Sequence, residues 1–363
     1  MAEAGVTPAS GPPKTLDELH EYLRAAVQLE LSVIPPYLCG LYTMYADSNL
    51  ESALILRSVV TEEMLHLTLA ANVLMAVGGD PPRLASRELA PEYPLLLVIE
   101  EGLPPPERFV VHLLPFSPPA VETFLKIENP AHPPSAMPEL AAREATPTHV
   151  ARLGFATVGA FYAAVEQGLC DLTESLGEKA VFSGDPRFQV EPAYYYAGGG
   201  SVAPVRHLEG ALAALEEIVD QGEGDLDAPY DEDGDLAHYY RFLEIARDRR
   251  YTESDPPDDP TGAPLGVDYE AVYPMRPDPK TSDYPSAELR AASDACNRTY
   301  TELLRVVDGA FATTDQDAKG DALIAAVGKM LELRNAAGVL VRNPIPDGSG
   351  EHAGPTFELV PDD

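Results

Sequence analysis

The chain has 363 residues, of which 45% are hydrophobic, so it contains enough apolar material for a sizeable buried core. Its formal net charge of -34 at pH 7 would repel phosphate backbones and anionic membrane surfaces, which argues against nucleic acids and membranes as partners. The first residues lack the apolar core of a signal peptide, and no stretch reaches the ~20 consecutive apolar residues of a membrane span. We therefore expect a cytoplasmic protein.

Proline separates the predicted helices, because the 36 prolines gather between apolar periodic segments rather than inside them. The first helix is expected to begin near Thr15, with Glu18 completing a capping box, and to run to about Tyr45 with a break at Pro35 and Pro36. Further helices are predicted at about 50–77, 148–176, 205–222, 236–250, 287–311 and 321–340.

A long connection over residues 81–147 separates the second and third predicted helices. It contains two strand-like runs, 95–99 and 109–114, and it is too long for an ordinary helix hairpin. Such a crossover is typical of four-helix bundles in which the second and third helices run in the same direction. We expect a bundle over residues 14–250, followed over 251–363 by a linker and a C-terminal helical extension that packs on the bundle.

Three other features favour structural roles. Cys39, Cys170 and Cys296 are far apart and odd in number, which fits reduced core thiols better than disulfides or a thiolate metal site. The glycine run at 198–200 lacks the strand and the lysine of a phosphate-binding loop, so we interpret it as part of a loop over 177–203. Asp315 begins a calcium-loop-like run without the final glutamate, which favours a helix cap.

The second predicted helix carries a possible metal-binding pair, Glu63 and His66. Residues three apart on a helix face the same way, so one carboxylate and one imidazole can reach a common ion. Both lie on an otherwise apolar stripe, where an isolated carboxylate would be costly unless it is paired or binds a metal. By itself this spacing is common, and a salt-bridged surface pair is the alternative.

Two other helices repeat this arrangement, since each has one glutamate in mid-length on an apolar face. Glu30 continues the stripe of the first helix, and Glu166 continues that of the third. Single glutamates from two helices and Glu-x-x-His from the others are typical of di-metal carboxylate bundles. A glutamate at the core edge, paired with an arginine, remains the alternative for each. Tyr37 and Tyr162 lie near these positions and are either pocket residues or ordinary core tyrosines.

The fourth helix lacks an obvious Glu-x-x-His, and we expect Glu223 and His238 to supply it. The apolar stripe at 208, 212, 215 and 219 leads to Glu223, and removing 225–236 as a twelve-residue insertion would place His238 three positions after it. The helix would then be interrupted at the level of the metal. Alternatively, Glu223 belongs to an exposed acidic turn, and Glu216 or Glu217 is the ligand.

The runs LELSVIPPYLCGLY, TEEMLHLTLAANVL and EEIVDQGEG followed by HYYRFLEI contain most of these candidates. Together they resemble a bacterial ferritin-like family whose domain also occurs in iminophenylpyruvate dimer synthases of violacein- and rebeccamycin-type pathways. The resemblance covers residues 14–250 and implies a mainly helical, ferritin-like four-helix bundle with oxidative chemistry in specialised metabolism. Because those synthases are much longer, the dimerisation reaction itself does not carry over to this chain.

The expected function is a non-haem di-metal oxidase or oxygenase that acts on a small organic substrate and dioxygen. Carboxylate oxygens with some imidazole suit two ions of iron, or alternatively of manganese. The predicted ligands are Glu30, Glu63, His66, Glu166, Glu223 and His238. A metal-binding or storage protein without turnover, and a metal-free binding module, are the alternatives, and the sequence leaves the oligomeric state open.

Overall fold

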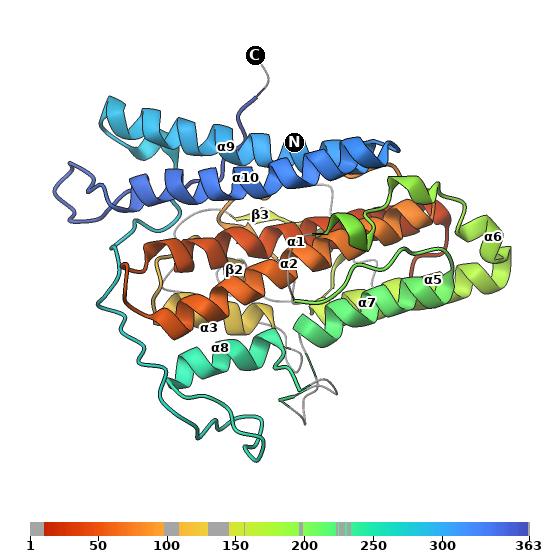
Figure 1. Cartoon of the computed structure of the whole chain (residues 1–363), viewed down its shortest axis with the longest axis horizontal. Coiled ribbons are helices and arrows are strands. Elements are labelled where there is room, and N and C mark those ends of the chain that lie inside the picture. Colours follow the sequence, from red (N-terminus) through yellow and green to blue (C-terminus); the bar gives the residue numbers. More distant parts are fainter. Residues whose placement is uncertain are drawn as a thin grey trace, which may run out of the picture.

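The fold is mainly helical (Figure 1), and a computed structural model describes residues 11–97, 109–129, 145–155, 157–195, 199–222, 224, 229–230 and 234–361. The longer helices are α1 (Leu16–Thr43), α2 (Leu50–Ala76), α3 (Pro118–Ile127), α5 (Val158–Leu176), α7 (Leu208–Gly222), α8 (His238–Arg247), α9 (Ala287–Ala312) and α10 (Gln316–Val341). The short helices are α4 (His149–Leu153), α6 (Glu178–Val181), η3 (Pro186–Phe188), η4 (Pro192–Tyr194) and η5 (Thr281–Asp283).

Helix α1 begins as predicted, because the side chain of Thr15 accepts a hydrogen bond from the backbone N–H of Glu18. The predicted break at Pro35 and Pro36 is wrong. Both prolines lie inside a single helix that continues to Thr43.

A side chain from outside the helix compensates for one of these prolines. Proline has no N–H, so Pro36 cannot donate to the carbonyl oxygen of Ser32 one turn earlier. The hydroxyl of Tyr93 donates to that oxygen at 2.6 Å instead. The connection after α2 therefore supplies a hydrogen bond that the sequence of α1 alone lacks.

Helix α2 closely matches its predicted span and packs along α1. With a mean hydropathy of 1.2 over an 18-residue window, it is long and apolar enough to cross a membrane, which corrects the expectation that no stretch reaches that limit. However, 83% of that window is buried inside the fold. Its middle also carries the buried ionisable side chains of Glu62, Glu63 and His66, as expected for a core helix with a functional site.

The third and fourth elements of the bundle are each made of two helices. Helices α3 and α5 both pack against α1, whereas α7 and α8 both pack against α2. Within this layer α3 contacts α8, and α5 contacts α7. Figure 1 shows α3 and α8 beneath one half of the α1–α2 pair, and α5 and α7 beneath the other half. The third element (α3 and α5) and the fourth element (α7 and α8) are therefore both interrupted near the middle of the bundle.

The predicted single helix at 148–176 is wrong, because this segment forms two helices, α4 and α5. Helix α4 ends at Gly154, whose left-handed φ of 82° suits glycine. A new helix, α5, starts after Thr157, whose side chain accepts a hydrogen bond from the N–H of Ala160. Helix α3 was not predicted, although Ser117 followed by proline at the first helical position is a typical helix start.

The long connection forms a small sheet next to α1. Strand β1 (Leu95–Leu96) pairs antiparallel with β2 (Val110–Val111) and parallel with β3 (Thr146–Pro147). The two predicted strand-like runs therefore do form strands, although much shorter ones, and residues 98 and 99 lie outside the described part of the chain. The pairing brings the two ends of the connection together.

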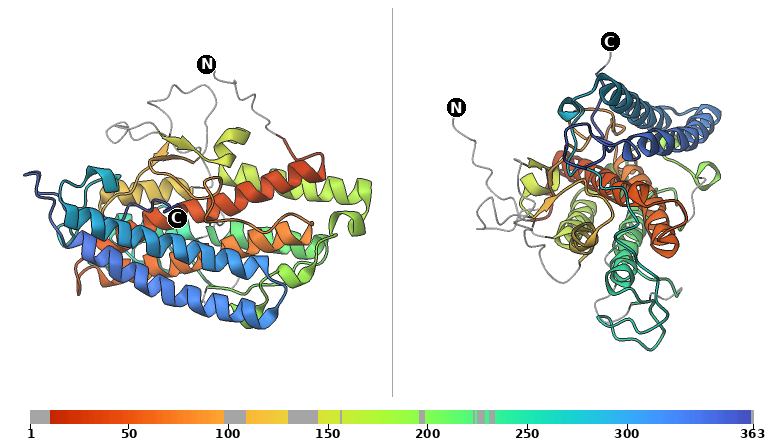
Figure 2. Two further views of the ribbon diagram at one scale, coloured as in Figure 1. Left: turned by 90° about the horizontal axis from the view of Figure 1, so that it is seen from above. Right: turned by 90° about the vertical axis from the view of Figure 1, so that its left-hand side faces the viewer.

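Helices α9 and α10 pack against each other along most of their length, and α10 contacts α1. Figures 1 and 2 show this hairpin on the side of the α1–α2 pair opposite to α7 and α8. Helix α10 begins earlier than predicted, because the Asp315 side chain accepts hydrogen bonds from the N–H groups of Asp317 and Ala318, which confirms the helix-cap interpretation. One buried hydrophobic cluster includes side chains of α1, α2, α9 and α10. The division of the chain near residue 250 stays a prediction.

Candidate metal centre

The functional candidates of α2 lie in the interior, as their apolar stripe predicts. Glu63 and His66 are 2% and 1% exposed, and their neighbours on the stripe, Val59, Ala70 and Val73, are fully buried. The Nδ1 atom of His66 lies 3.5 Å from Oε2 of Glu63. The pair is therefore a buried cluster and not the surface salt bridge that was the alternative.

Helix α1 adds Glu30 to this cluster. Its stripe of buried leucine and valine leads to Glu30, whose Oε2 lies 3.6 Å from Nδ1 of His66. The other carboxylate oxygen accepts a hydrogen bond from the hydroxyl of Tyr162 on α5. Glu30 is thus held by a tyrosine and not by an arginine, so one oxygen remains directed toward the histidine.

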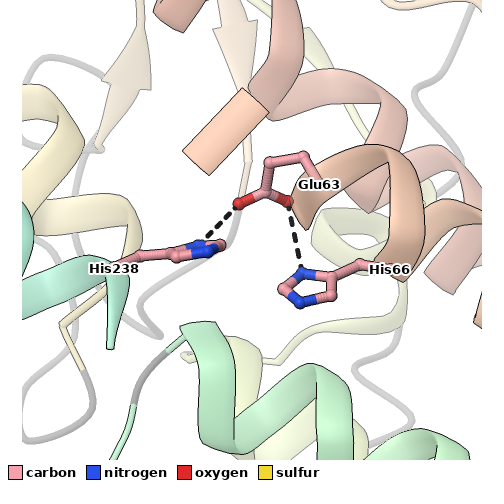
Figure 3. Close-up of side chains that lie close together, drawn as sticks. All are labelled: Glu63, His66 and His238. Carbon is pink, nitrogen blue, oxygen red and sulfur yellow. Dashed lines mark ion pairs between the residues drawn. The ribbon is translucent and has the colours of Figure 1, made fainter. Parts of the chain in front are cut away.

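His238, the first residue of α8, completes a group of three ligand-type side chains (Figure 3). Its Nδ1 lies 2.9 Å from Oε1 of Glu63, so each oxygen of this carboxylate faces a different imidazole. One ligand atom from each of Glu63, His66 and His238 lies within 4.8 Å of the others. The two rings stack with centroids 5.3 Å apart.

The outer nitrogen of each histidine has its own acceptor. Nε2 of His238 lies 2.8 Å from Oε2 of Glu62, and Arg241 holds that carboxylate with contacts of 2.7 and 2.8 Å. Nε2 of His66 lies 3.1 Å from Oε1 of Gln221 on α7. These acceptors favour the tautomer with the proton on Nε2, an inference from the hydrogen bonds. Once the imidazoles are neutral, that tautomer would direct the Nδ1 lone pairs into the cluster.

Glu128, which follows α3, is a further carboxylate of the cluster that the sequence analysis missed. It is 7% exposed and accepts a hydrogen bond from the hydroxyl of Tyr37. Its Oε1 lies 3.9 Å from Nδ1 of His238. The helical spacing in the sequence indicates this position, since Glu128 falls four residues after the buried Phe124 and seven after the buried Val121. It was overlooked because the proline-rich connection was not recognised as containing a helix.

Glu166 is the predicted ligand that the structure does not bring to the cluster. The buried face of α5 follows Tyr162, Val165 and Leu169, and Glu166 is only half-buried at its edge. Burial, with the nearby carboxylates Glu216 and Asp220 of α7, raises the pKa of Glu166. Tyr162 lies one turn earlier, about 6 Å along the axis, and is the α5 residue that reaches Glu30.

The prediction for the fourth helix has a mixed outcome. The inward face of α7 follows Ala211, Ala214, Leu215, Ile218 and Gly222. It is therefore offset by one residue from the predicted stripe.

At the end of that face, a Cβ on Gly222 would lie 3.4 Å from Oε2 of Glu128. Glu223 lies outside the described residues, so its role stays a prediction. Glu216 is exposed, and Glu217 accepts a hydrogen bond from Gln221 at 2.7 Å. His238 joins the cluster from the start of α8 as predicted, so the interruption of the fourth element lies at the level of the cluster.

The two imidazoles of the cluster bind protons more strongly than a free histidine. Burial raises the pKa of Glu30 to about 7. Burial also acts to raise the pKa of Glu63, but the interactions with the nearby imidazoles of His238 and His66 outweigh it and lower that pKa to about 2. The pKa of His66 rises to about 10, because Glu30 and Glu63 outweigh the opposing effect of burial. Similarly, Glu128, Glu62 and Glu63 overcome burial and raise the pKa of His238 well above its usual value. The carboxylates therefore strongly favour positive charge at the imidazoles.

The residues fit a metal centre. A cavity of about 30 Å³ lies between Glu30, Glu63, His66, Glu128 and Tyr162. Nδ1 of His238 is buried close to Glu63 but lacks a partner with hydrogen-bond geometry among the described residues, as expected for an atom aimed at a ligand. Three buried carboxylates and two imidazoles also supply five of the six donor side chains of a di-metal bundle, which combines four glutamates with two histidines. No thiolate lies in this set, which favours iron or manganese.

Comparison with known proteins agrees with the fold and with the resemblance noted in the sequence. A dichlorochromopyrrolate synthase from Lentzea aerocolonigenes is 25% identical over 417 aligned positions, covering 99% of this chain and 37% of that protein. The chain therefore spans just over a third of that relative's length. The crystal structure of a ferritin-like protein from Caulobacter vibrioides matches with a TM-score of 0.59 and 22% identity, covering 96% of this chain and 100% of the other. The ferritin-like family model matches residues 23–247, and the chain therefore belongs to the ferritin-like family.

Proposed function

We propose that the chain is a non-haem di-metal oxidoreductase that acts on a small organic substrate with dioxygen. The observation that carries this proposal is the position of Glu63. Its two oxygens face two different imidazoles, Nδ1 of His238 at 2.9 Å and Nδ1 of His66 at 3.5 Å. One carboxylate between two histidines supports a pair of ions, with Glu30 on the side of His66 and Glu128 on the side of His238.

Iron or manganese at these residues would supply one-electron redox chemistry with dioxygen. The protein orients the ligands and keeps water away from them. Glu62 holds His238 in the orientation that presents Nδ1, and Arg241 neutralises Glu62, so that this carboxylate can serve as an acceptor inside the fold. The hydroxyls of Tyr162 and Tyr37 each donate to one oxygen of Glu30 and Glu128, respectively. Oε2 of Glu30, which faces His66, is thereby left for an ion. In Glu128 the oxygen that accepts from Tyr37 is also the one nearest to His238, so Oε2 is the oxygen without a tyrosine donor.

The relative is named as a synthase of a small organic molecule, which supports a small organic substrate for this chain. Because the chain spans only 37% of that protein, the relative's complete reaction is not part of the proposal. The free thiols of Cys39, Cys170 and Cys296 support a reducing, cytoplasmic location. The high negative charge supports the expectation that neither nucleic acid nor an anionic membrane is a partner.

Anaerobic reconstitution with ferrous iron tests this function. We expect about two ions per chain and a new near-ultraviolet or visible absorption band once oxygen is admitted. Glu63→Ala and His66→Ala should lose both properties, whereas Glu302→Gln, in an exposed ion pair with Lys329, should keep them. Full iron content without a spectral change would favour a storage role. Full iron content in Glu63→Ala and His66→Ala would contradict the assigned centre.

A further inference from the structure

A second, much larger cavity lies on the other side of the α1–α2 pair. It has a volume of about 550 Å³ and is lined mainly by apolar side chains of α1, α2, α9 and α10, among them Leu38, Leu67, Leu304 and Met330. This volume falls within the ~300–1,000 Å³ that is typical of sites for small organic molecules. The C-terminal hairpin thus covers a pocket as well as the bundle.

This cavity is separate from the metal centre. On α2 it is lined by Met64 and Leu67, whereas the preceding residues, Glu63 and His66, line the small cavity of the metal centre. No described residue belongs to both linings. In Figure 1 the hairpin of α9 and α10 lies on one side of α1 and α2, and α7, which contributes to the lining of the small cavity, lies on the other.

The wall of the large cavity contains an unsatisfied polar group. Tyr300 of α9 lines it and is 4% exposed, yet its hydroxyl has no hydrogen-bond partner among the described residues. A buried hydroxyl without a partner is costly, and most buried polar groups in proteins are paired. The ring itself packs edge-on against Phe357, so the hydroxyl is the only part of the side chain that needs a partner. A ligand with a hydrogen-bond acceptor would supply one.

Positive charge lies at the edge of the same cavity. Arg57 of α2 and Arg334 of α10 both line it and are exposed, and neither guanidinium forms an ion pair in the part of the chain that the structure describes. Val327 and Leu331, which also line the cavity, are 44% and 57% exposed, so an apolar opening adjoins α10. A ligand with an anionic group at the edge of the cavity and an apolar body inside it would match both the two arginines and the apolar opening.

We propose that this cavity binds a small, mainly apolar organic carboxylate. The apolar body occupies the space between α1, α2 and the C-terminal hairpin. The hydroxyl of Tyr300 donates a hydrogen bond to an acceptor of the ligand, and Arg57 and Arg334 attract its carboxylate at the edge. The site goes beyond the proposed metal chemistry and does not depend on a loaded metal centre.

Displacement of a fluorescent apolar anion tests this proposal in the full-length protein. The probe is 1-anilinonaphthalene-8-sulfonate, the competitor is decanoate, and decylamine is the competitor of opposite charge. We expect one saturable binding site for the probe per chain. Decanoate should displace the probe from this site, whereas decylamine should not. The double variant Arg57→Gln/Arg334→Gln should weaken decanoate binding by at least about tenfold. Arg298→Gln, an exposed residue of α9 outside the cavity, is the matched control and should bind normally.

Two more variants test the interior. Tyr300→Phe should weaken decanoate binding while leaving the melting temperature unchanged or higher, because it removes a hydroxyl without a partner. Ala326→Leu, at a buried position of the lining, should reduce probe binding by filling the cavity, and its melting curve shows whether it folds.

His66→Ala should still bind decanoate, which separates this site from the metal centre. The proposal is overturned if decanoate does not displace the probe or if the arginine and Tyr300 variants bind like the unaltered chain. It is also overturned if the chain self-associates through α10 and excludes the probe.

Discussion

The Nε2 atom of His238 lies 2.8 Å from Oε2 of Glu62, a residue 176 positions earlier in the chain. This contact joins α8 to α2 and turns the other ring nitrogen toward Glu63. Glu62 and Glu63 are adjacent in sequence but have different roles. Glu62 accepts from Nε2 and orients the imidazole, whereas Glu63 lies next to Nδ1. The contact therefore couples the packing of α8 to the geometry of the candidate metal centre.

Replacing Glu62 should weaken metal binding although Glu62 lies on the outer side of His238, away from the cluster. Glu62→Gln keeps the shape of the side chain but removes the charge that holds Arg241 and that makes the imidazole more basic. Loss of such an outer partner typically costs about 10–100-fold in metal affinity. Titration of the metal-free protein with ferrous or manganous ions measures the effect, and Glu51→Gln, in an ion pair with Arg250, is the control. Unchanged affinity in Glu62→Gln would show that this contact does not orient a ligand.

Two glutamates distinguish the structural assignment of the centre from the sequence prediction. Glu128→Gln should lose bound metal, because Glu128 lies at the cluster and 3.9 Å from His238. Glu166→Gln should retain metal, since Glu166 is half-buried near α7. Elemental analysis of both purified variants, with circular dichroism to confirm folding, measures this difference. Metal loss in the second variant alone would restore the sequence prediction and remove Glu128 from the site.

Metal binding should release protons at neutral pH. In the metal-free fold the pKa of His66 is raised from 6.5 to about 10 by Glu30 and Glu63 against the effect of burial. His66 is therefore protonated on both ring nitrogens at pH 7. An ion reaches Nδ1 only by displacing the proton on that nitrogen. Metal affinity should consequently rise with pH toward about 10. Calorimetric titrations in buffers with different ionisation enthalpies measure the number of protons released, and the absence of proton release would contradict this account.

Tyr93→Phe should destabilise the fold by about 1–3 kcal/mol, because it leaves the buried carbonyl of Ser32 without its donor. Pro36 cannot replace that donor. Thermal or denaturant unfolding measures the loss. Tyr300→Phe is the matched control, since it also removes a buried tyrosine hydroxyl, but one that has no partner among the described residues. Equal destabilisation by both variants would mean that the Tyr93 hydrogen bond has no special role in α1.

Local patterns in the sequence were enough to predict the helical class and three members of the buried cluster, and treating 225–236 as an insertion added His238. The stripes of α1 and α2 place Glu30, Glu63 and His66 in the interior, because residues three and four apart on a helix face the same side. That inference needs no knowledge of neighbouring helices. The N-terminal caps of α1 and α10 are likewise local, since each depends on one side chain and the next few backbone N–H groups.

Only the tertiary structure decided which residues complete the cluster. Glu128 rather than Glu166 reaches the cluster, because the third element of the bundle consists of α3 and α5, and the end of α3 and the start of α5 line the same small cavity. Periodicity within one helix cannot show where two helices meet. Tyr93 allows α1 to continue through its prolines by a contact across 61 residues. The acceptors of both histidines also come from distant segments, Gln221 for His66 and Glu62 for His238. A helical stripe determines which side of a helix faces inward, but the packing of separate segments determines which atoms meet there.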